Sequence, residues 1–146
     1  MPAPATERTV SNRPPTSHAK LHILLVEDNV DTAYSLSQLL ELEGYQVTVA
    51  ASVAEALAHD GAIDLLITDV GLPDGSGLGI LHRLRNPDAI PGIVLSGYGS
   101  SDDVRRSREA GFRYHLTKPV DFTDLVTAIE AVSDVARSAS PAPTHG

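Results

Sequence analysis

The chain has no cysteine among its 146 residues, which excludes a disulfide framework and a metal site built from thiolates. It also has no long hydrophobic run, since no apolar stretch approaches the roughly 18 residues that a membrane-spanning helix needs. Nothing near the first residue resembles a signal peptide. We therefore expect a soluble, cytoplasmic protein that does not act at a membrane.

Positive charge is scarce in this sequence. The formal net charge is -8, which argues against a protein that binds nucleic acid directly. The sequence contains only two lysines, Lys20 and Lys118, and Lys20 lies at the edge of the expected fold. Lys118 is therefore the only lysine well inside the domain.

Hydrophobic residues make up 42% of the chain, which is enough for a packed core, and the length fits one domain. The first and last stretches are rich in Pro, Ser, Thr and Ala, a composition typical of flexible tails. We predict one domain over residues 20–138, between flexible tails at 1–19 and 139–146.

Strand-like and helix-like patterns alternate between the expected tails. Short apolar or alternating runs are each followed by a segment of helical spacing. The expected strands are 22–26, 46–50, 64–69, 92–95 and 112–116. The expected helices are 29–43, 52–60, 77–84, 101–111 and from 121 through 132. This order predicts an α/β fold, a single-domain (βα)5 doubly wound parallel sheet with helices on both faces.

Chemically active side chains stand at the carboxyl ends of four expected strands. Glu27 and Asp28 follow the first strand, Asp69 ends the third, Ser96 follows the fourth and Lys118 follows the fifth. In an open parallel sheet, ligands bind outside the carboxyl ends of the strands. Each residue alone could be an ordinary loop residue, but five at equivalent strand ends indicate a site.

This set of side chains favours a hard cation and phosphoryl chemistry. Neighbouring carboxylates repel one another and raise each other's pKa unless a cation lies between them. With no cysteine and no nearby histidine, oxygen ligands favour Mg²⁺, with Mn²⁺ as a possible substitute, over Zn²⁺. An aspartate can attack phosphorus to form an aspartyl phosphate, while a metal and an ammonium neutralise charge on the transferring group.

The motifs around these residues resemble the receiver domain of bacterial two-component response regulators. The resemblance covers about residues 21–135, and its motifs occur in the family's order and spacing. They are 24–29, Asp69 with 72–75, 95–97 and 116–119. The resemblance implies the flavodoxin-like strand order 2-1-3-4-5.

By this resemblance, Asp69 is the phosphoacceptor and Asp28 a direct metal ligand. Glu27 would bind the metal through water, and the backbone carbonyl of Gly71 would be the third protein ligand. Ser96 matches the hydroxyl that moves towards the phosphoryl group.

By the same resemblance, Lys118 is the lysine that pairs with the phosphoryl group. The resemblance also implies a cis peptide bond before Pro119. His115 stands where the family usually has a Tyr or Phe that acts as a switch. It is either a half-exposed histidine or a switch residue that moves as Ser96 moves, and in the second case its charge would make the switch pH-sensitive near neutrality. Tyr98 and Gly71 occupy positions that tune the lifetime of the phosphate in the family.

The resemblance implies a signalling receiver and not a conventional enzyme. It would take a phosphoryl group from a histidine kinase or a histidine phosphotransfer protein, with Mg²⁺, and then shift towards an active conformer. A downstream partner would bind the face of the fourth helix, fifth strand and fifth helix. The protein would be a monomer or a phosphorylation-dependent dimer.

Several versions of this function stay open. The patterns at 70–77 and 95–99 look most like receivers attached to hybrid sensor kinases. The chain is therefore either a stand-alone regulator or a receiver excised from such a kinase. A receiver that binds partners without phosphorylation is a further alternative.

Two other α/β classes fit less well. A hydrolase of the haloacid-dehalogenase type needs a second Asp two residues after its nucleophile, and Gly71 stands there. A flavodoxin needs a phosphate loop rich in Ser, Thr and Gly after the first strand, where Glu27 and Asp28 would repel a phosphate.

Overall fold

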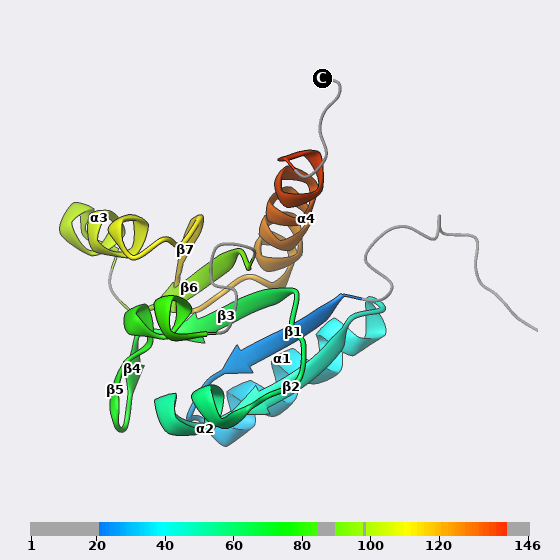
Figure 1. Cartoon of the computed structure of the whole chain (residues 1–146), viewed down its shortest axis with the longest axis horizontal. Coiled ribbons are helices and arrows are strands. Elements are labelled where there is room, and N and C mark those ends of the chain that lie inside the picture. Colours follow the sequence, from blue (N-terminus) through cyan, green and yellow to red (C-terminus); the bar gives the residue numbers. More distant parts are fainter. Residues whose placement is uncertain (1–20, 85–89, 98, 140–146) are drawn as a thin grey trace, which may run out of the picture.

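The computed structural model describes residues 21–84, 90–97 and 99–139, and Figure 1 shows its architecture. The expected tails at 1–19 and 139–146 lie outside these residues, apart from Ala139. The domain limits that we drew from composition therefore stay a prediction.

Within the described residues, the central sheet has five strands, all parallel, in the order β2-β1-β3-β6-β7. This order confirms the flavodoxin-like topology. The strand after the first helix therefore lies at one edge of the sheet, and β3 lies in the middle. The strands are β1 (His22–Val26), β2 (Gln46–Ala50), β3 (Leu65–Asp69), β6 (Gly92–Ser96) and β7 (Tyr114–Thr117).

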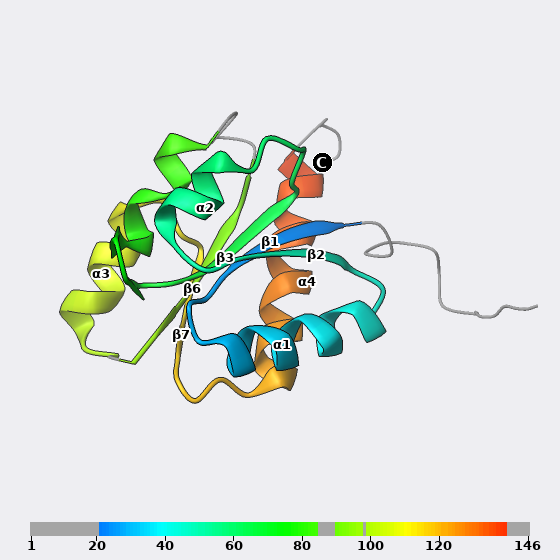
Figure 2. The same ribbon diagram turned by 90° about the horizontal axis from the view of Figure 1, so that it is seen from below.

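Helices cover both faces of the sheet, as Figures 1 and 2 show. On one face, α1 (Val30–Leu42) and α4 (Phe122–Ala139) pack against alternate strand residues such as Ile23 and Leu25. On the other face, α2 (Val53–Ala58) packs against the residues between them, such as Leu24. Because side chains alternate along a strand, each strand contributes to both cores.

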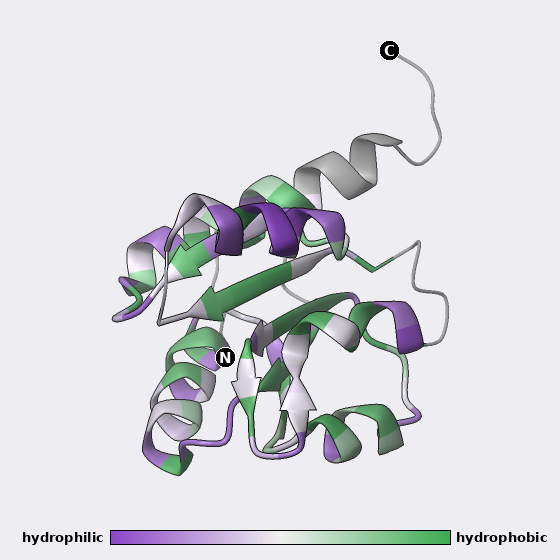
Figure 3. Cartoon of the chain, turned by 90° about the vertical axis from the view of Figure 1, so that its left-hand side faces the viewer, coloured by the Kyte–Doolittle hydropathy of each residue, from purple (hydrophilic) through white to green (hydrophobic). Residues whose placement is uncertain are grey.

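The three central strands consist almost entirely of buried residues, and β3 is buried along its whole length. Figure 3 shows this pattern as mainly green, hydrophobic strands between helices that carry both colours. Continuous apolar runs of this kind are typical of parallel strands covered on both faces. The polar side chains of the site are therefore located at the ends of these strands.

Local sequence explains where the helices begin. Asn29 caps α1 by accepting a hydrogen bond from the backbone N–H of Thr32, and Ser52 caps α2 in the same way by accepting one from Glu55. α1 ends at Leu42, one residue before its predicted end, and Gly44 just after it has a positive φ of 102°. α2 ends at Ala58, two residues earlier than predicted, and α3 spans Ser101–Glu109.

The predicted helix at 77–84 is wrong. In its place the described stretch has two 3-10 helices, η3 (Gly77–Gly79) and η4 (Leu81–Arg83). Two glycines within the first three residues make a regular α-helix unfavourable, because glycine loses the most backbone freedom on folding. Ile80 and Leu81 still pack into the core.

A short hairpin follows β3 that was not predicted as strands. β4 (Gly71–Leu72) pairs antiparallel with β5 (Gly75–Ser76). Pro73 and Asp74 form the turn between them, and Gly75 has a positive φ of 151°. The sequence Leu-Pro-Asp-Gly is typical of a tight turn, so turn chemistry shapes this segment.

Gly77 lies against the backbone of β3, and we predict that Gly77→Ala destabilises the fold. A Cβ at this position would overlap the backbone oxygen of Asp69 and come within 2.6 Å of Thr68 Oγ1. Relieving this overlap requires a backbone shift, with an expected loss of about 1–3 kcal/mol in unfolding free energy. Urea denaturation measures this loss.

Gly79→Ala is the matched control, because nothing lies within 4 Å of a Cβ built there. It should leave stability unchanged or raise it by up to about 1 kcal/mol. Equal losses for the two variants would contradict the steric explanation.

Candidate functional site

The carboxyl ends of the strands bring the predicted site residues to one edge of the sheet. Glu27 and Asp28 directly follow β1, Asp69 ends β3, Ser96 ends β6 and Lys118 follows β7. The strand register supports this grouping, because Asp69 pairs with the residue before Ser96 on β6. The parallel topology alone therefore brings these five residues to the same edge of the sheet.

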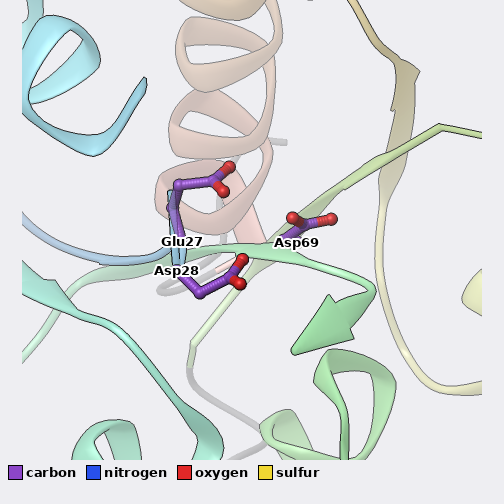
Figure 4. A group of neighbouring side chains, drawn as sticks. All are labelled: Glu27, Asp28 and Asp69. Carbon is purple, nitrogen blue, oxygen red and sulfur yellow. The ribbon is translucent and has the colours of Figure 1, made fainter. Parts of the chain in front are cut away.

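Glu27, Asp28 and Asp69 form a compact acidic cluster, drawn in Figure 4. One carboxylate oxygen from each lies within 4.8 Å of the others. Glu27 and Asp69 are buried, with 2% and 8% of their surface exposed, whereas Asp28 is exposed. The cluster is therefore a group of negative charges that is exposed to solvent at Asp28.

Lys118 binds two of these three carboxylates. Its Nζ donates to Oδ2 of Asp69 at 2.9 Å and to Oε1 of Glu27 at 3.1 Å. The second oxygen of Glu27, Oε2, accepts from the backbone N–H of Asn29 at 3.1 Å. Hydrogen bonds between charged groups are stronger than neutral ones, so Lys118 fixes the positions of Glu27 and Asp69.

The Lys118 ammonium stays protonated in this site. Partial burial alone would lower its pKa, but the hydrogen bonds and negative charges of Asp69 and Glu27 outweigh burial and raise the pKa above its usual value. A raised lysine pKa keeps the ammonium charged throughout the neutral range.

The backbone around Lys118 holds it beside β6. Its N–H donates to the carbonyl of Ser96 at 2.7 Å. The Lys118–Pro119 peptide bond is cis, as the resemblance implied.

The charge of the site is left unbalanced. Three carboxylates and one ammonium give two negative charges in excess. The donor atoms of the cluster are carboxylate oxygens, and no cysteine or histidine belongs to this described group. Hard oxygen donors and excess negative charge fit a divalent cation such as Mg²⁺.

The chain matches the family described as the response regulator receiver domain over residues 23–130. It belongs to this family. The receiver domain is a signalling module and not a conventional enzyme, so the predicted class of function is confirmed.

Relatives and solved structures support this assignment. A protein of Leptolyngbya boryana with no described function is 35% identical over 117 residues, 77% of this chain and 89% of that protein. The transcriptional regulatory protein CpxR of Escherichia coli is 39% identical over 111 residues, 75% of this chain and 48% of CpxR. This receiver thus spans about half the length of that regulator.

The crystal structure of a CheY-like receiver domain protein from Methanospirillum hungatei has the same fold. It superposes with a TM-score of 0.74 at 34% identity, and the match covers 80% of this chain and 96% of that one. Receiver domains act as phosphoacceptors in two-component signalling, and this chain has the fold and sequence of that group.

Three further predicted site residues lie on β4, β6 and β7 of the receiver. Ser96 is buried at the end of β6, and Gly71 is exposed on β4. His115 lies outside the cluster, partly buried on β7, where its Nδ1 is 3.1 Å from Oγ of Ser107 on α3. Tyr98 lies outside the described residues.

The sequence did not reveal how Asp74 contributes to the receiver. Its carboxylate accepts hydrogen bonds from the backbone N–H groups of Ala54 and Val53, which lower its pKa. An Asp in a Pro-Asp-Gly turn is explained by the turn itself. No local signal points to partners 20 and 21 residues away.

We predict that Lys118→Met destabilises the metal-free receiver by about 2 kcal/mol, because it leaves two buried carboxylates without a cation between them. Adding Asp69→Asn to Lys118→Met should restore part of this loss, since the repulsion disappears. Urea denaturation in the presence of a chelator measures both effects.

The matched control is Arg105→Met, which removes an ion pair with Asp102 whose side chains are 62% and 71% exposed. Exposed pairs contribute little, so this variant should stay within about 0.5 kcal/mol of the parent. Similar losses for Lys118→Met and Arg105→Met would show that the site does not depend on its lysine.

Proposed function

We propose that Asp69 accepts a phosphoryl group from the phosphohistidine of a histidine kinase or a histidine phosphotransfer protein. The observation that carries this proposal is the contact between the Lys118 ammonium and Oδ2 of Asp69, next to an acidic cluster with excess negative charge. Membership of the receiver family supplies the class of reaction.

The proposed transfer uses Asp69 as the nucleophile. A carboxylate oxygen of Asp69 attacks phosphorus as the bond between phosphorus and the donor imidazole nitrogen breaks, and that nitrogen leaves with the bonding electron pair. The Asp69 side chain is 12% exposed, so a donor can reach it from the solvent side. Lys118 then lies beside the new phosphoryl group, where its charge stabilises the phosphoryl oxygens.

The same proposal assigns the divalent cation, Mg²⁺ or Mn²⁺, to Asp28, Asp69 and the backbone carbonyl of Gly71. Both oxygens of Glu27 already accept hydrogen bonds, from Lys118 and Asn29, which supports the prediction that Glu27 binds the cation through water. A bound cation would neutralise charge on the transferring phosphoryl group.

Ser96 and His115 form the proposed switch. Ser96 is buried at the end of β6, one strand from Asp69, so a small movement of its hydroxyl would reach a phosphoryl oxygen. His115 connects β7 to Ser107 on α3. The phosphorylated state would favour a conformer in which Ser96 has moved towards the phosphoryl group and the contact between His115 and Ser107 has changed.

The face of α3, β7 and α4 would report this change to a downstream partner. Tyr114 on β7 is 41% exposed, and the side chains of Arg105 and Arg106 on α3 are 62% and 63% exposed. The receiver would act as a monomer or as a dimer that forms on phosphorylation.

We infer that the receiver is located in the cytoplasm. No described helix is long and apolar enough to cross a membrane. A stand-alone regulator and a receiver excised from a hybrid kinase remain alternatives, and the resemblance to hybrid-kinase receivers stays a prediction.

The proposed chemistry predicts a single phosphoryl addition to the intact protein incubated with acetyl phosphate and Mg²⁺. Asp69→Asn should show no addition, and neither should the parent protein with a chelator, because both the nucleophile and the cation are required. Mass spectrometry of the intact protein measures this. Asp102→Asn, which removes an exposed carboxylate, should be phosphorylated like the parent.

Phosphorylation of Asp69→Asn at the parent level would contradict the assignment. No addition to the parent protein, from acetyl phosphate or from a phosphohistidine donor, would instead favour a receiver that works without phosphorylation.

We also predict that Mg²⁺ stabilises the receiver through Asp28. At a Mg²⁺ concentration ten times its dissociation constant, the parent protein should gain about 1.4 kcal/mol in unfolding free energy. Asp28→Asn should gain little. Without metal this variant should be at least as stable as the parent, because one repelling carboxylate is gone.

Thermal unfolding followed by circular dichroism, with and without Mg²⁺, measures both effects. An equal Mg²⁺-dependent gain in the parent protein and in Asp28→Asn would show that the cation binds elsewhere.

A further inference from the structure

The side chain of Asp74 forms hydrogen bonds between the hairpin that carries Gly71 and the start of α2. Asp74, in the turn between β4 and β5, accepts from the backbone N–H of Val53 with Oδ1 at 2.8 Å and from that of Ala54 with Oδ2 at 2.9 Å. Val53 and Ala54 are the first two residues of α2. Their N–H groups are among the four that a helix cannot satisfy within itself.

The N-terminus of α2 also has its own cap, so Asp74 is an addition to it. The hydroxyl of Ser52 accepts from the N–H of Glu55 at 3.1 Å, which satisfies a third N–H group. The helix therefore has a normal cap from its own chain. Unlike the Ser52 cap, the hydrogen bonds to Asp74 join α2 to a segment 20 residues away.

The hairpin is too small to hold its own shape. Each of its strands has two residues, and these are exposed or half-buried. Isolated two-stranded hairpins are marginal in water even when they are longer. Its base is fixed by two backbone bonds, from Val70 N–H to the Leu95 carbonyl at 3.1 Å and from Gly77 N–H to the Val70 carbonyl at 2.8 Å. Asp74 fixes its tip.

The other end of this connection reaches the acidic cluster. The N–H of Glu27 donates to the carbonyl of Ala50 at 3.0 Å, and the N–H of Ala51 donates to Oε1 of Glu55 at 2.8 Å. These hydrogen bonds, together with the backbone between Ala50 and Ala54, thus connect Glu27 to Asp74 through the loop between β2 and α2. The backbone of Gly71 lies between the fixed base and the fixed tip of the hairpin.

We propose that Asp74 is a positioning residue for divalent-cation binding. By tying the hairpin to α2, it holds the backbone carbonyl of Gly71 in place relative to Asp28 and Asp69 before the cation arrives. Groups behind the direct ligands typically change metal affinity by 10-fold or more when they are removed. This inference rests on the proposed function, because it takes the carbonyl of Gly71 as a ligand.

The test is Mn²⁺ binding without any phosphoryl donor, measured from the electron paramagnetic resonance signal of free Mn²⁺. Asp74→Ala should bind Mn²⁺ about 10-fold more weakly than the parent protein, because the hairpin must then be ordered on binding. Asp74→Asn keeps one acceptor oxygen and should lie between the two.

Ser52→Ala is the matched control, since it removes a cap from the same helix end and leaves the link to the hairpin. It should bind Mn²⁺ within about twofold of the parent protein. In phosphorylation by acetyl phosphate, Asp74→Ala should need more Mg²⁺ for its half-maximal rate. At saturating Mg²⁺ its rate should return to the parent value.

Two results would overturn the inference while the proposed function stands. One is an affinity for Mn²⁺ that is the same in Asp74→Ala and in the parent protein. The other is an equal weakening by Ser52→Ala and Asp74→Ala, which would mean that only the stability of α2 matters. A parent protein that binds no Mn²⁺ would instead remove the proposed metal site itself, together with the role of Asp74.

Discussion

The ion pairs of Lys118 with Asp69 and Glu27 are the interaction on which the site depends. Two buried carboxylates at the end of a parallel sheet would repel each other, and the ammonium between them turns repulsion into attraction, at 2.9 and 3.1 Å. The single positive charge of Lys118 balances only one of the three carboxylates of the cluster, however. The site is therefore held together without a metal and still has the excess negative charge that attracts a divalent cation.

The parallel sheet makes this arrangement possible because its strands are rigid and buried, while the reactive side chains lie at the carboxyl ends of the strands. β3 is buried along its whole length, so the position of Asp69 is fixed by packing. The contact that the proposed switch would change, between His115 on β7 and Ser107 on α3, lies outside that rigid strand. A receiver needs both properties, since the nucleophile must stay in place while the surface changes.

Residues at strand ends could be predicted from the sequence, because periodicity locates the strands and parallel topology brings their carboxyl ends together. The helix predicted at 77–84 was wrong because its apolar spacing was helical while its glycines were not compatible with a regular α-helix. The bonds from Asp74 to α2 could not be predicted, since they join residues that only the folded sheet brings together.

A crystal of the receiver soaked with Mn²⁺ would test the central claim most directly, because anomalous scattering locates the metal independently of any activity. Our account predicts one peak, in contact with the carboxylates of Asp28 and Asp69 and the carbonyl of Gly71, with Lys118 still bound to Glu27. No peak at saturating Mn²⁺, or a peak that displaces Lys118 from Glu27 and Asp69, would contradict it.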